Sequence, residues 1–566
     1  MNKRFSYLFV FLIAVCFTAC KKTNKQGRYI PADAGIVIHI DGKSLLSKLP
    51  WSEIKNNEVF QAAYSDSNMQ STVKKLLDDP EKAGIDINND ILIFIKKDTS
   101  GGYVAIEGAV KDAAALKTFN VEVTNGGAEG ETDGVHYISK APLCAGWNNE
   151  KFLYIIDAPA MKQMDALSKR MAHDSIDVPA SMPRDLTATV KSIFALSEGN
   201  TLAKDEKFTK LMNEGGDIKA WISSENLVGD LGMFGMLANL EKLYKGSVTT
   251  FAANFDNGKI TINGHSYAGD DLGKLYKKYG GGKVSEDMIK RIPGKEMIFV
   301  AGMNFKPEGV KEFLKMLGVD GLFNTQVGKQ LGFTLDDFVK ANKGDIVFGL
   351  SDFHLSTDTT PTVLQPDLPP AAISKKPEFN FVFAASIGDK DAFNKLINAG
   401  KKMGSEMPQQ NAIGYSSNGE YFVLSNTKDN ADKYLASTNS GDVASKISGQ
   451  AFGGFVNIQA AMKSFGNEVS RDSLDKAMYD VNLKFWDNVI WKGGDIDDGA
   501  IVQTVEINLV DKSSNSLKQF NQFSSKLGGL VKEKMKKHKE DIMAYEDATN
   551  STVDSVVTQM QAKPNK

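Results

Sequence analysis

A chain of 566 residues exceeds what one hydrophobic core holds, so we expect two or more domains. Its content of 42% hydrophobic and 24% charged residues is ordinary for a globular protein. The formal net charge of -3 excludes the strongly basic surface of a nucleic-acid-binding protein, and no nucleic-acid partner is predicted.

The N-terminus predicts export and lipid anchoring. A basic start precedes the apolar stretch 7–17, which is shorter than the roughly 20 residues of a transmembrane helix and suits a signal peptide. The residues Phe-Thr-Ala-Cys at 17–20 resemble the lipobox of bacterial lipoproteins, although leucine is more usual than phenylalanine at its first position. That resemblance implies that residues 1–19 are removed as a signal peptide and that Cys20 carries the lipid. A signal peptide that is cut after Ala19 without lipidation is the alternative.

The segment 20–28 is polar and predicts a flexible tether, so the membrane is the first predicted partner. No acidic run follows Cys20, which favours a place on the periplasmic side of the outer membrane. Cys16 leaves with the signal peptide and Cys20 carries the lipid, so Cys144 is the one free cysteine of the mature chain, and an intrachain disulfide is excluded. Its apolar neighbours predict a buried, inert thiol.

The folded part predicts a tandem duplication into two α+β halves. Each half combines a larger and a smaller unit of strands and helices. The halves are 29–283, with units 29–172 and 205–283, and 285–530, with units 291–440 and 449–530.

The larger unit of the first half begins with alternating β-branched residues at Ile36–Ile40, which predict its first strand. Apolar runs at 91–95 and 103–107 predict the next two strands, and apolar residues at helical spacing in 111–119 predict a helix. Two further strands and a helix at 160–170 follow. This order is typical of split βαβ, ferredoxin-like elements, that is, an antiparallel sheet with helices on one face.

The same order recurs in the second half, where Asn418-Gly419 predicts a tight hairpin turn. The smaller units share a strand, a turn of Asp, Asn or Gly, a second strand and a helix. Glycine-rich 126–134 and proline-rich 356–377 are interpreted as loops. The tail 531–566 is polar and predicts a solvated helix that ends in disorder.

Three short motifs invite a chemical interpretation. Asp-Gly-Lys-Ser at 41–44 resembles the end of a phosphate-binding loop, but Val37 stands where that loop needs a glycine, so a polar helix N-terminus is the better interpretation. The acidic segments 86–90 and 495–499 begin like calcium loops and lack the glycine at the sixth position. They are interpreted as acidic turns.

The six histidines show no metal-binding spacing, and His39, His136 and His265 are interpreted as half-buried strand residues. Trp486 and Trp491 suit either a glycan or peptide groove or a core. No nucleophile elbow or dinucleotide-binding loop occurs. We therefore predict no catalytic, cofactor-binding or metal-binding residues, and no cofactor.

The lipobox, the Ile-Pro-Ala-Asp-Ala segment at 30–34 and the duplicated strand–helix units together resemble the DUF4836 family of Bacteroidetes lipoproteins. The resemblance spans nearly the whole mature chain. It implies a lipid-anchored envelope protein, and it offers no activity and no functional residues to carry over.

The first hypothesis is a non-enzymatic envelope lipoprotein that binds a protein or glycan partner across its repeated sheet units. An envelope hydrolase with carboxylates dispersed along the sequence is the alternative, because a pair of acids in a cleft leaves no sequence motif. A structural spacer without a ligand is the third.

Overall fold

The computed structural model describes residues 26–66, 69, 71–98, 101–158, 184–228, 241–323, 325, 328–357, 375–405, 414–436, 442–466 and 473–561. The predicted signal peptide, Cys20 and the predicted helix at 160–170 lie outside these residues. Strands and helices are mixed throughout, which confirms the α+β class.

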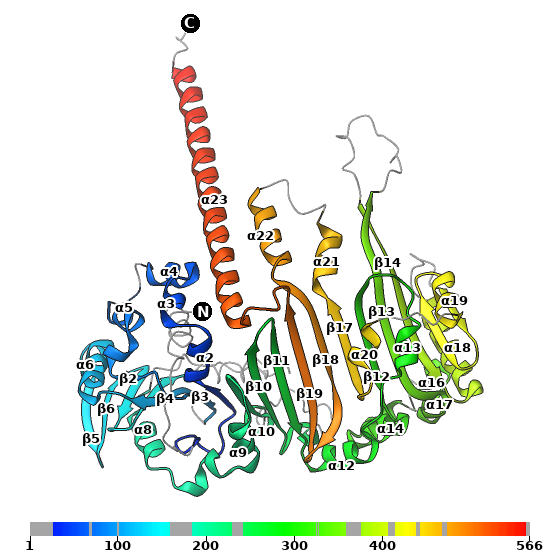
Figure 1. The fold of residues 1–566 in the computed structure, drawn as a ribbon, viewed down its shortest axis with the longest axis horizontal. Coiled ribbons are helices and arrows are strands. Elements are labelled where there is room, and N and C mark those ends of the chain that lie inside the picture. Colours follow the sequence, from blue (N-terminus) through cyan, green and yellow to red (C-terminus); the bar gives the residue numbers. More distant parts are fainter. Residues whose placement is uncertain are drawn as a thin grey trace.

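The strands form one long sheet in which every neighbouring pair is antiparallel (Figure 1). A two-residue strand, β2 (Ile85–Asp86), extends the pairing at the end of β4. From one end of the sheet to the other, the order is β5 (Ala128–Thr132), β6 (Val135–Lys140), β7 (Leu143–Trp147), β8 (Lys151–Asp157), β4 (Tyr103–Val110), β3 (Ile91–Lys96), β1 (Ile36–Ile40), β9 (Ile218–Ser223), β10 (Val248–Asp256), β11 (Lys259–Tyr267), β19 (Ala500–Leu509), β18 (Trp486–Asp497), β17 (Phe452–Asn457), β12 (Met297–Asn304), β13 (Asn342–Thr357), β14 (Lys375–Ile387), β16 (Tyr421–Ser425) and β15 (Gly414–Ser417).

The strand order of one half of the sheet repeats in the other half, read from the opposite end. β8, β4, β3, β1, β9, β10 and β11 correspond in order to β16, β14, β13, β12, β17, β18 and β19. The two series meet where β11 pairs with β19. Asn263 lies five residues after the turn glycine Gly258, Thr504 lies five residues after Gly499, and these two residues face each other across the junction. A local two-fold axis therefore passes through this pair.

The helices of the first half are short and connect the strands. They are α2 (Gly42–Lys48), α3 (Trp51–Lys55), α4 (Glu58–Tyr64), α5 (Ser71–Asp78), α6 (Ala113–Thr124), α8 (Thr187–Phe194), α9 (Glu206–Asn213), α10 (Ser224–Val228), α11 (Glu241–Tyr244) and α12 (Asp270–Tyr279). Single turns of 3-10 helix occur at Pro80–Ala83, Glu198–Asn200 and Leu202–Lys204.

The second half adds one long helix to a similar set. Its helices are α13 (Glu286–Lys290), α14 (Pro307–Met316), α15 (Asp320–Leu322), α16 (Gly328–Leu331), α17 (Leu335–Ala341), α18 (Lys390–Ser405), α19 (Lys428–Ala436), α20 (Val443–Ile447), α21 (Ile458–Phe465), α22 (Ser473–Leu483) and α23 (Ser516–Gln561).

Helices cover both faces of the sheet in the first half, which corrects the expectation of one face. We call face A the side that carries Ile93 and Ile106, which pack with side chains of α2, α4, α5 and α6. Face B carries Leu92 and Phe94, which pack with side chains of α8 and α9. Neighbouring residues of β3 thus enter different cores, because side chains alternate across a strand. The sequence of β3 begins with a continuous apolar run, which is the pattern of a strand that is buried on both sides.

One helical connection has the arrangement of the expected split βαβ elements, which hold further strands between the two strands that a helix connects. α6 connects β4 to β5, and β8, β7 and β6 lie between these two strands in the sheet. The connection after β1 differs, since its helices lead back to β3, which pairs directly with β1.

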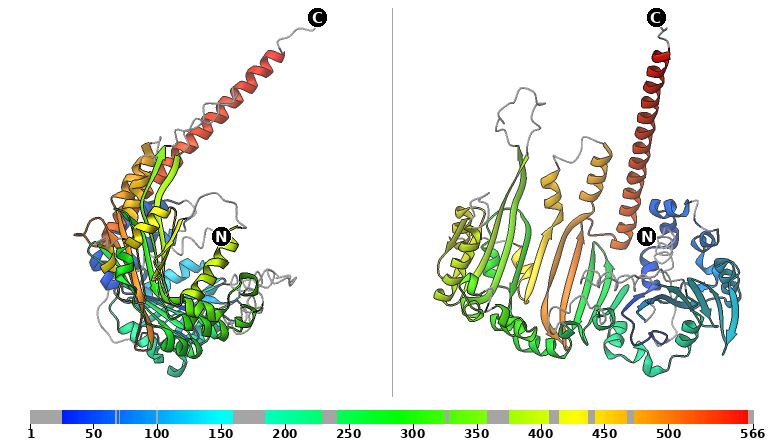
Figure 2. Two further views of the ribbon diagram at one scale, coloured as in Figure 1. Left: turned by 90° about the vertical axis from the view of Figure 1, so that its right-hand side faces the viewer. Right: turned by 180° about the vertical axis from the view of Figure 1, so that it is seen from behind.

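α23 is continuous from Ser516 to Gln561 and runs through residue 530, where the second half was predicted to end and the polar tail to begin. A Cβ atom on Gly528 would lie 2.7 Å from Cγ2 of Val59 in α4, and Gly529 lies close to Glu58. This glycine pair lets the two helices approach closely. Beyond this contact α23 projects away from the sheet (Figures 1 and 2).

Two predicted loops have different outcomes. Residues 126–134, interpreted as a loop, contain the exposed edge strand β5, which pairs with β6. Its polar sequence Ala-Glu-Gly-Glu-Thr lacks the apolar alternation that predicts a strand. Most of the proline-rich segment 356–377 lies outside the described residues. The Asn418-Gly419 turn forms as predicted between β15 and β16.

Candidate functional site

An apolar platform crosses face A at the centre of the sheet. It consists of two neighbouring rows of residues that oppose one another from β11 to β14. One row is Ile262, Val505, Trp491, Gly454, Ala301, Phe348 and Phe383, and the other is Ile260, Ile507, Val489, Val456, Phe299, Leu350 and Phe381. Neighbouring strands lie about 4.8 Å apart, so seven strands give the platform a width of roughly 30 Å.

The platform is partly open to solvent. Phe348 is 37% exposed, and Trp491 and Phe299 are half-buried, as are the other members except Gly454. Scattered exposed apolar residues are normal on protein surfaces, whereas a contiguous apolar patch marks an interaction surface. We therefore take the platform as the candidate functional site.

Contacts between aromatic rings determine the shape of the platform surface. The ring of Phe299 contacts Trp491 at a centroid distance of 6.0 Å and Phe348 at 5.7 Å, and Phe348 stacks with Phe381 at 6.4 Å. A Cβ atom on Gly454 would lie 2.0 Å from the indole of Trp491. The glycine therefore allows the indole to lie across β17, which leaves a broad aromatic surface instead of an upright side chain.

One end of the platform borders on α21. Phe465 of this helix is 43% exposed and contacts the ring of Phe353 in β13 at 5.0 Å. Beside it, Phe485 and Trp486 pack against Phe523 of α23, at 4.1 Å between the Phe485 and Phe523 rings. Trp486 and Trp491 thus lie in different environments, since Trp486 packs in a cluster with Phe485 and Phe523 and Trp491 belongs to the platform.

A row of buried polar side chains crosses face B of the first half. Lys219 of β9 opposes His39 of β1, which opposes Leu92, and Leu92 opposes Glu107 of β4. His39, Glu107 and Lys219 are almost fully buried. Charged residues at such positions need partners, because burial removes their hydration.

His39 and Glu107 each lie close to an oppositely charged or polar side chain. Nε2 of His39 lies 3.3 Å from Oδ1 of Asp90, and Gln26 donates a hydrogen bond of 2.6 Å to the other oxygen of Asp90. Nζ of Lys151 lies 3.0 Å from Oε1 of Glu107. Nζ of Lys219 donates a hydrogen bond of 2.7 Å to the carbonyl of Met212. The row is therefore a buried polar network beneath α9 and the N-terminal segment, in which Glu107 and Lys151 form the close ion pair.

The pKa shifts in this network follow from burial and charge. Burial opposes ionisation of Asp90, but hydrogen bonds with His39 and Gln26, together with the charges of His39 and Lys151, outweigh it and hold the pKa of Asp90 below its usual value. Burial lowers the pKa of Lys219. Burial also acts to lower the pKa of Lys151, but Glu107 outweighs it, and the pKa of Lys151 is raised.

These shifts bear on the hydrolase alternative. A hydrolase that uses two carboxylates needs one of them as a general acid with a raised pKa. Asp90 has the opposite shift, and Glu107 is paired with Lys151. The network therefore suits strand cohesion better than proton transfer. The stability that Asp90 contributes is present above the normal pKa of an aspartate and is lost as the pH falls through its depressed pKa.

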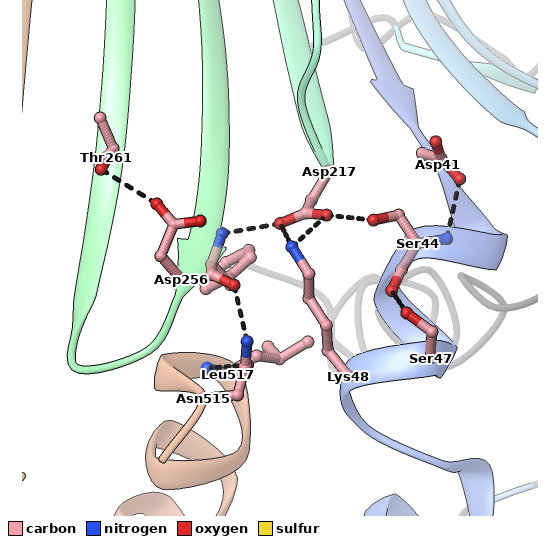
Figure 3. A network of polar contacts seen from close by, with 10 residues as sticks. Asp41, Ser44, Ser47, Lys48, Asp217, Asp256, Thr261, Asn515 and Leu517 are labelled. Carbon is pink, nitrogen blue, oxygen red and sulfur yellow. Dashed lines mark hydrogen bonds and ion pairs between the residues drawn. The ribbon is translucent and has the colours of Figure 1, made fainter. Parts of the chain in front are cut away.

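A polar junction links the first half to the start of α23 (Figure 3). The buried carboxylate of Asp217 accepts hydrogen bonds from Nζ of Lys48 at 2.5 and 2.7 Å, from Oγ of Ser44 at 2.5 Å and from the backbone N–H of Phe255 at 2.6 Å. The carbonyl of Phe255 accepts a hydrogen bond of 2.7 Å from Asn515. The junction thus fixes α2, β10 and α23 to one another.

The short motifs of the sequence are structural where they are described. Asp41 of the Asp-Gly-Lys-Ser segment caps α2, since its carboxylate accepts a hydrogen bond of 2.9 Å from the Ser44 N–H. Asp86 binds Asn88 and Asn89 within a turn, and 495–499 ends β18 and turns into β19. The part of the chain that the structure describes contains no group of three or more His, Cys, Asp or Glu residues that could hold a metal ion.

Cys144 and the histidines lie in different environments. Cys144 is buried in β7, and burial raises the pKa of its thiol to about 11. His39 joins the charged network, and His136 lies at the surface, 3.2 Å from Glu131. His265 lies beside Glu214 on face B. Cys20 and His173 lie outside the described residues.

Sequence reasoning predicted most strands of the platform and missed the platform itself. A signal was present, since apolar and polar residues alternate in β11 and β19, as in Ile260-Thr261-Ile262 and Val505-Glu506-Ile507. Which strands lie side by side, and in which register, cannot be read from that alternation. The charged network also left a signal, namely charged residues inside strand patterns, such as Glu107 and Lys219.

The comparisons with known proteins give a family and no function. The family model described as "Domain of unknown function (DUF4836)" matches residues 27–365. No curated protein and no solved structure matches the chain. Within the described residues, no helix has both the length and the apolar character needed to cross a membrane.

Proposed function

Since this chain belongs to the DUF4836 family, whose domain has no known function, we propose its role from its own surfaces: it is a lipid-anchored envelope protein that binds a partner protein on the apolar platform. The N-terminal sequence supports the anchor, with a lipobox-like segment at 17–20 of the kind found in Bacteroidetes lipoproteins. Anchoring through Cys20 and the tether 20–28 would place the sheet close to the membrane, on the periplasmic side of the outer membrane.

The platform is the single observation that carries the proposal. Protein interfaces combine a desolvated apolar centre with a polar rim, and tryptophan and other aromatic residues dominate their binding energy. Trp491, Phe299 and Phe348 form such a centre, because their rings contact one another and remain partly open to solvent. An amphipathic segment of a partner would bury this centre with its own apolar side.

The chemistry of the platform favours a protein over a glycan at this place. Its two rows contain aliphatic and aromatic side chains and no polar side chain. A glycan needs hydrogen-bond donors and acceptors for its hydroxyl groups, because an unpaired polar group that loses water costs free energy. A flat apolar surface offers none.

The test is photocrosslinking in intact cells of the source organism. A photoreactive phenylalanine analogue replaces Phe348 in the full-length protein, and the matched control places it at Tyr276 of α12, which is 41% exposed and lies outside the platform. We expect one reproducible envelope protein to be captured from position 348 and not from 276. The additional change Trp491→Ala should reduce that capture several-fold.

Capture of the same proteins from both positions would contradict the proposal, as would an absence of capture above background from position 348. In either case the platform would have to be assigned to the packing of this chain alone. The anchor is tested separately with Cys20→Ser, which should release the protein from the membrane fraction. Unchanged retention of that variant would contradict the lipid anchor and leave the platform result standing.

A further inference from the structure

A polar cavity lies on face B, where the two halves of the sheet meet. It has a volume of about 440 Å³ and lies between the end of α9 and the sheet. Six side chains that line it are Lys210, Glu214, Asn263, His265, Asp497 and Thr504. Its size falls within the range of small-molecule sites. The apolar platform is on the opposite face, so the two surfaces are independent.

The register of the central strands explains why polar side chains gather here. Asn263 and His265 are two residues apart in β11, so both point to face B. Thr504 of β19 lies opposite Asn263, and its hydroxyl donates a hydrogen bond of 3.1 Å to Oδ1 of Asn263. This bond occupies the amide oxygen, so the amide nitrogen is the end of Asn263 that can meet a ligand.

The imidazole of His265 is held in place by its neighbours, but its hydrogen-bonding capacity is incompletely used. Its ring stacks on Tyr267 at a centroid distance of 6.4 Å, and Nδ1 lies 3.5 Å from Oε1 of Glu214. This separation is too long for a good hydrogen bond, and the buried Nδ1 atom has no hydrogen-bond partner in the described part of the chain. Because Nδ1 is buried beside Glu214, the remaining edge of the imidazole is the part that lines the cavity.

The charges of the cavity restrict the class of ligand. Glu214 and Asp497 contribute two carboxylates, while Lys210 is paired with Asp498 at 3.0 Å. An anion would meet net negative charge and is disfavoured. The amide, the hydroxyl, the imidazole and the carboxylates together offer both donors and acceptors, which matches groups that donate and accept at once, namely the hydroxyls of a sugar.

We propose that this cavity binds a neutral carbohydrate of one or two sugar rings, held by Asn263, His265 and Glu214. The ligand lies over the local two-fold axis and contacts strands of both halves. α9 closes one side of the site, and the end of β18 closes another through Asp497.

The test is calorimetry or ligand-observed NMR on the full mature chain with three neutral disaccharides: maltose, cellobiose and N,N′-diacetylchitobiose. We expect at least one to bind at millimolar concentration or below. His265→Ala and Asn263→Ala should each weaken that binding at least about tenfold, the effect of losing one buried hydrogen bond. Thr504→Val keeps the side-chain volume and should also weaken it, because the Asn263 amide loses its orientation.

His136→Ala is the matched control, since His136 also lies beside a glutamate but at the surface of the first half. It should leave the affinity unchanged. If His265→Ala fails to fold, judged by its melting temperature, Thr504→Val and Asn263→Ala carry the test. The proposal is overturned if none of the three disaccharides binds. It is equally overturned if the affinity of the bound one does not change in the variants that fold.

Discussion

Glu107 and Lys151 show at the residue scale what a charged residue inside a strand pattern means in this protein. Both side chains are almost fully buried, and they lie 3.0 Å apart on face B. Removing one partner of such a pair leaves an unpaired buried charge, which costs more than the pair itself contributes. The contribution of each charge to the stability of the fold therefore depends on its partner more than on the sequence around it.

Lys151→Met should lower the free energy of unfolding by about 3–5 kcal/mol, because it leaves the Glu107 carboxylate buried without its partner. The combined change Lys151→Met with Glu107→Leu should recover most of this loss. Urea denaturation of the three proteins measures the effect. Equal destabilisation in the single and the double variant would show that the two charges are not coupled.

Cys144 provides a pH-dependent prediction. Burial raises the pKa of its thiol to about 11, against an ordinary value of 9.0, so the reactive thiolate is about 100-fold scarcer at pH 8 than in an exposed cysteine. In a protein that begins at residue 20 and carries Cys20→Ser, Cys144 is the one thiol, and its alkylation by iodoacetamide in the folded state should therefore be very slow at pH 8. It should become fast in guanidinium chloride. Fast labelling of the folded protein would contradict a buried thiol.

At the scale of elements, local signals predicted the strands well and the helix ends less well. The alternation in Ile36–Ile40 and the Asn418-Gly419 turn are local, and the structure follows both. The Gly528-Gly529 pair has the sequence of a helix end, yet its role is set by α4, more than 450 residues earlier in the chain. Only the tertiary contact distinguishes a close helix approach from a termination.

The long helix α23 divides into a packed part and a projecting part. Asn57 of the first half donates hydrogen bonds to Asn521 and Ser524, and Phe523 packs on Phe485. Beyond these contacts, Met535 is 69% exposed and Ile542 is 46% exposed. The first part therefore contributes to stability, and the described part of the second makes few contacts with the body.

Deleting residues 531–566 should leave the melting temperature of the protein almost unchanged. Deleting the whole helix from Ser516 should expose Phe485 and Trp486 and lower the melting temperature strongly or make the protein insoluble. Differential scanning calorimetry compares the two truncations. A large loss of stability in the shorter truncation would mean that the projecting part packs against the body.

At the scale of the whole molecule, the two series of strands share one sheet. The pairing of β11 with β19 joins them, and Asn263 opposes Thr504 at the centre. The α+β class could be predicted from local patterns, whereas the joining of the series could not. Two strands nearly 250 residues apart in sequence carry no local mark of their pairing. The candidate sites on both faces depend on that joining, so the sequence alone could not reveal them.

The division into the halves 29–283 and 285–530 stays a prediction, and an isolated half tests it. The fragment 29–283 should fold cooperatively and expose the edge of β11, which in the full chain pairs with its counterpart β19. We therefore expect the fragment to dimerise through two copies of β11, with Asn263 opposite Asn263. Sedimentation measures the dimer, and Ile262→Pro should disrupt it. A molten or insoluble fragment would contradict separable halves.

Radical footprinting tests most directly the central claim, that the apolar platform is occupied in the envelope. The oxidation rates of Trp491 and Phe348 are measured in the purified protein and in intact cells, with Tyr276 as the exposed reference residue. We expect both platform residues to be oxidised several-fold more slowly in cells, while Tyr276 reacts at the same rate in cells and in the purified protein. Equal rates for Trp491 and Phe348 in cells and in the purified protein would contradict a bound partner on the platform.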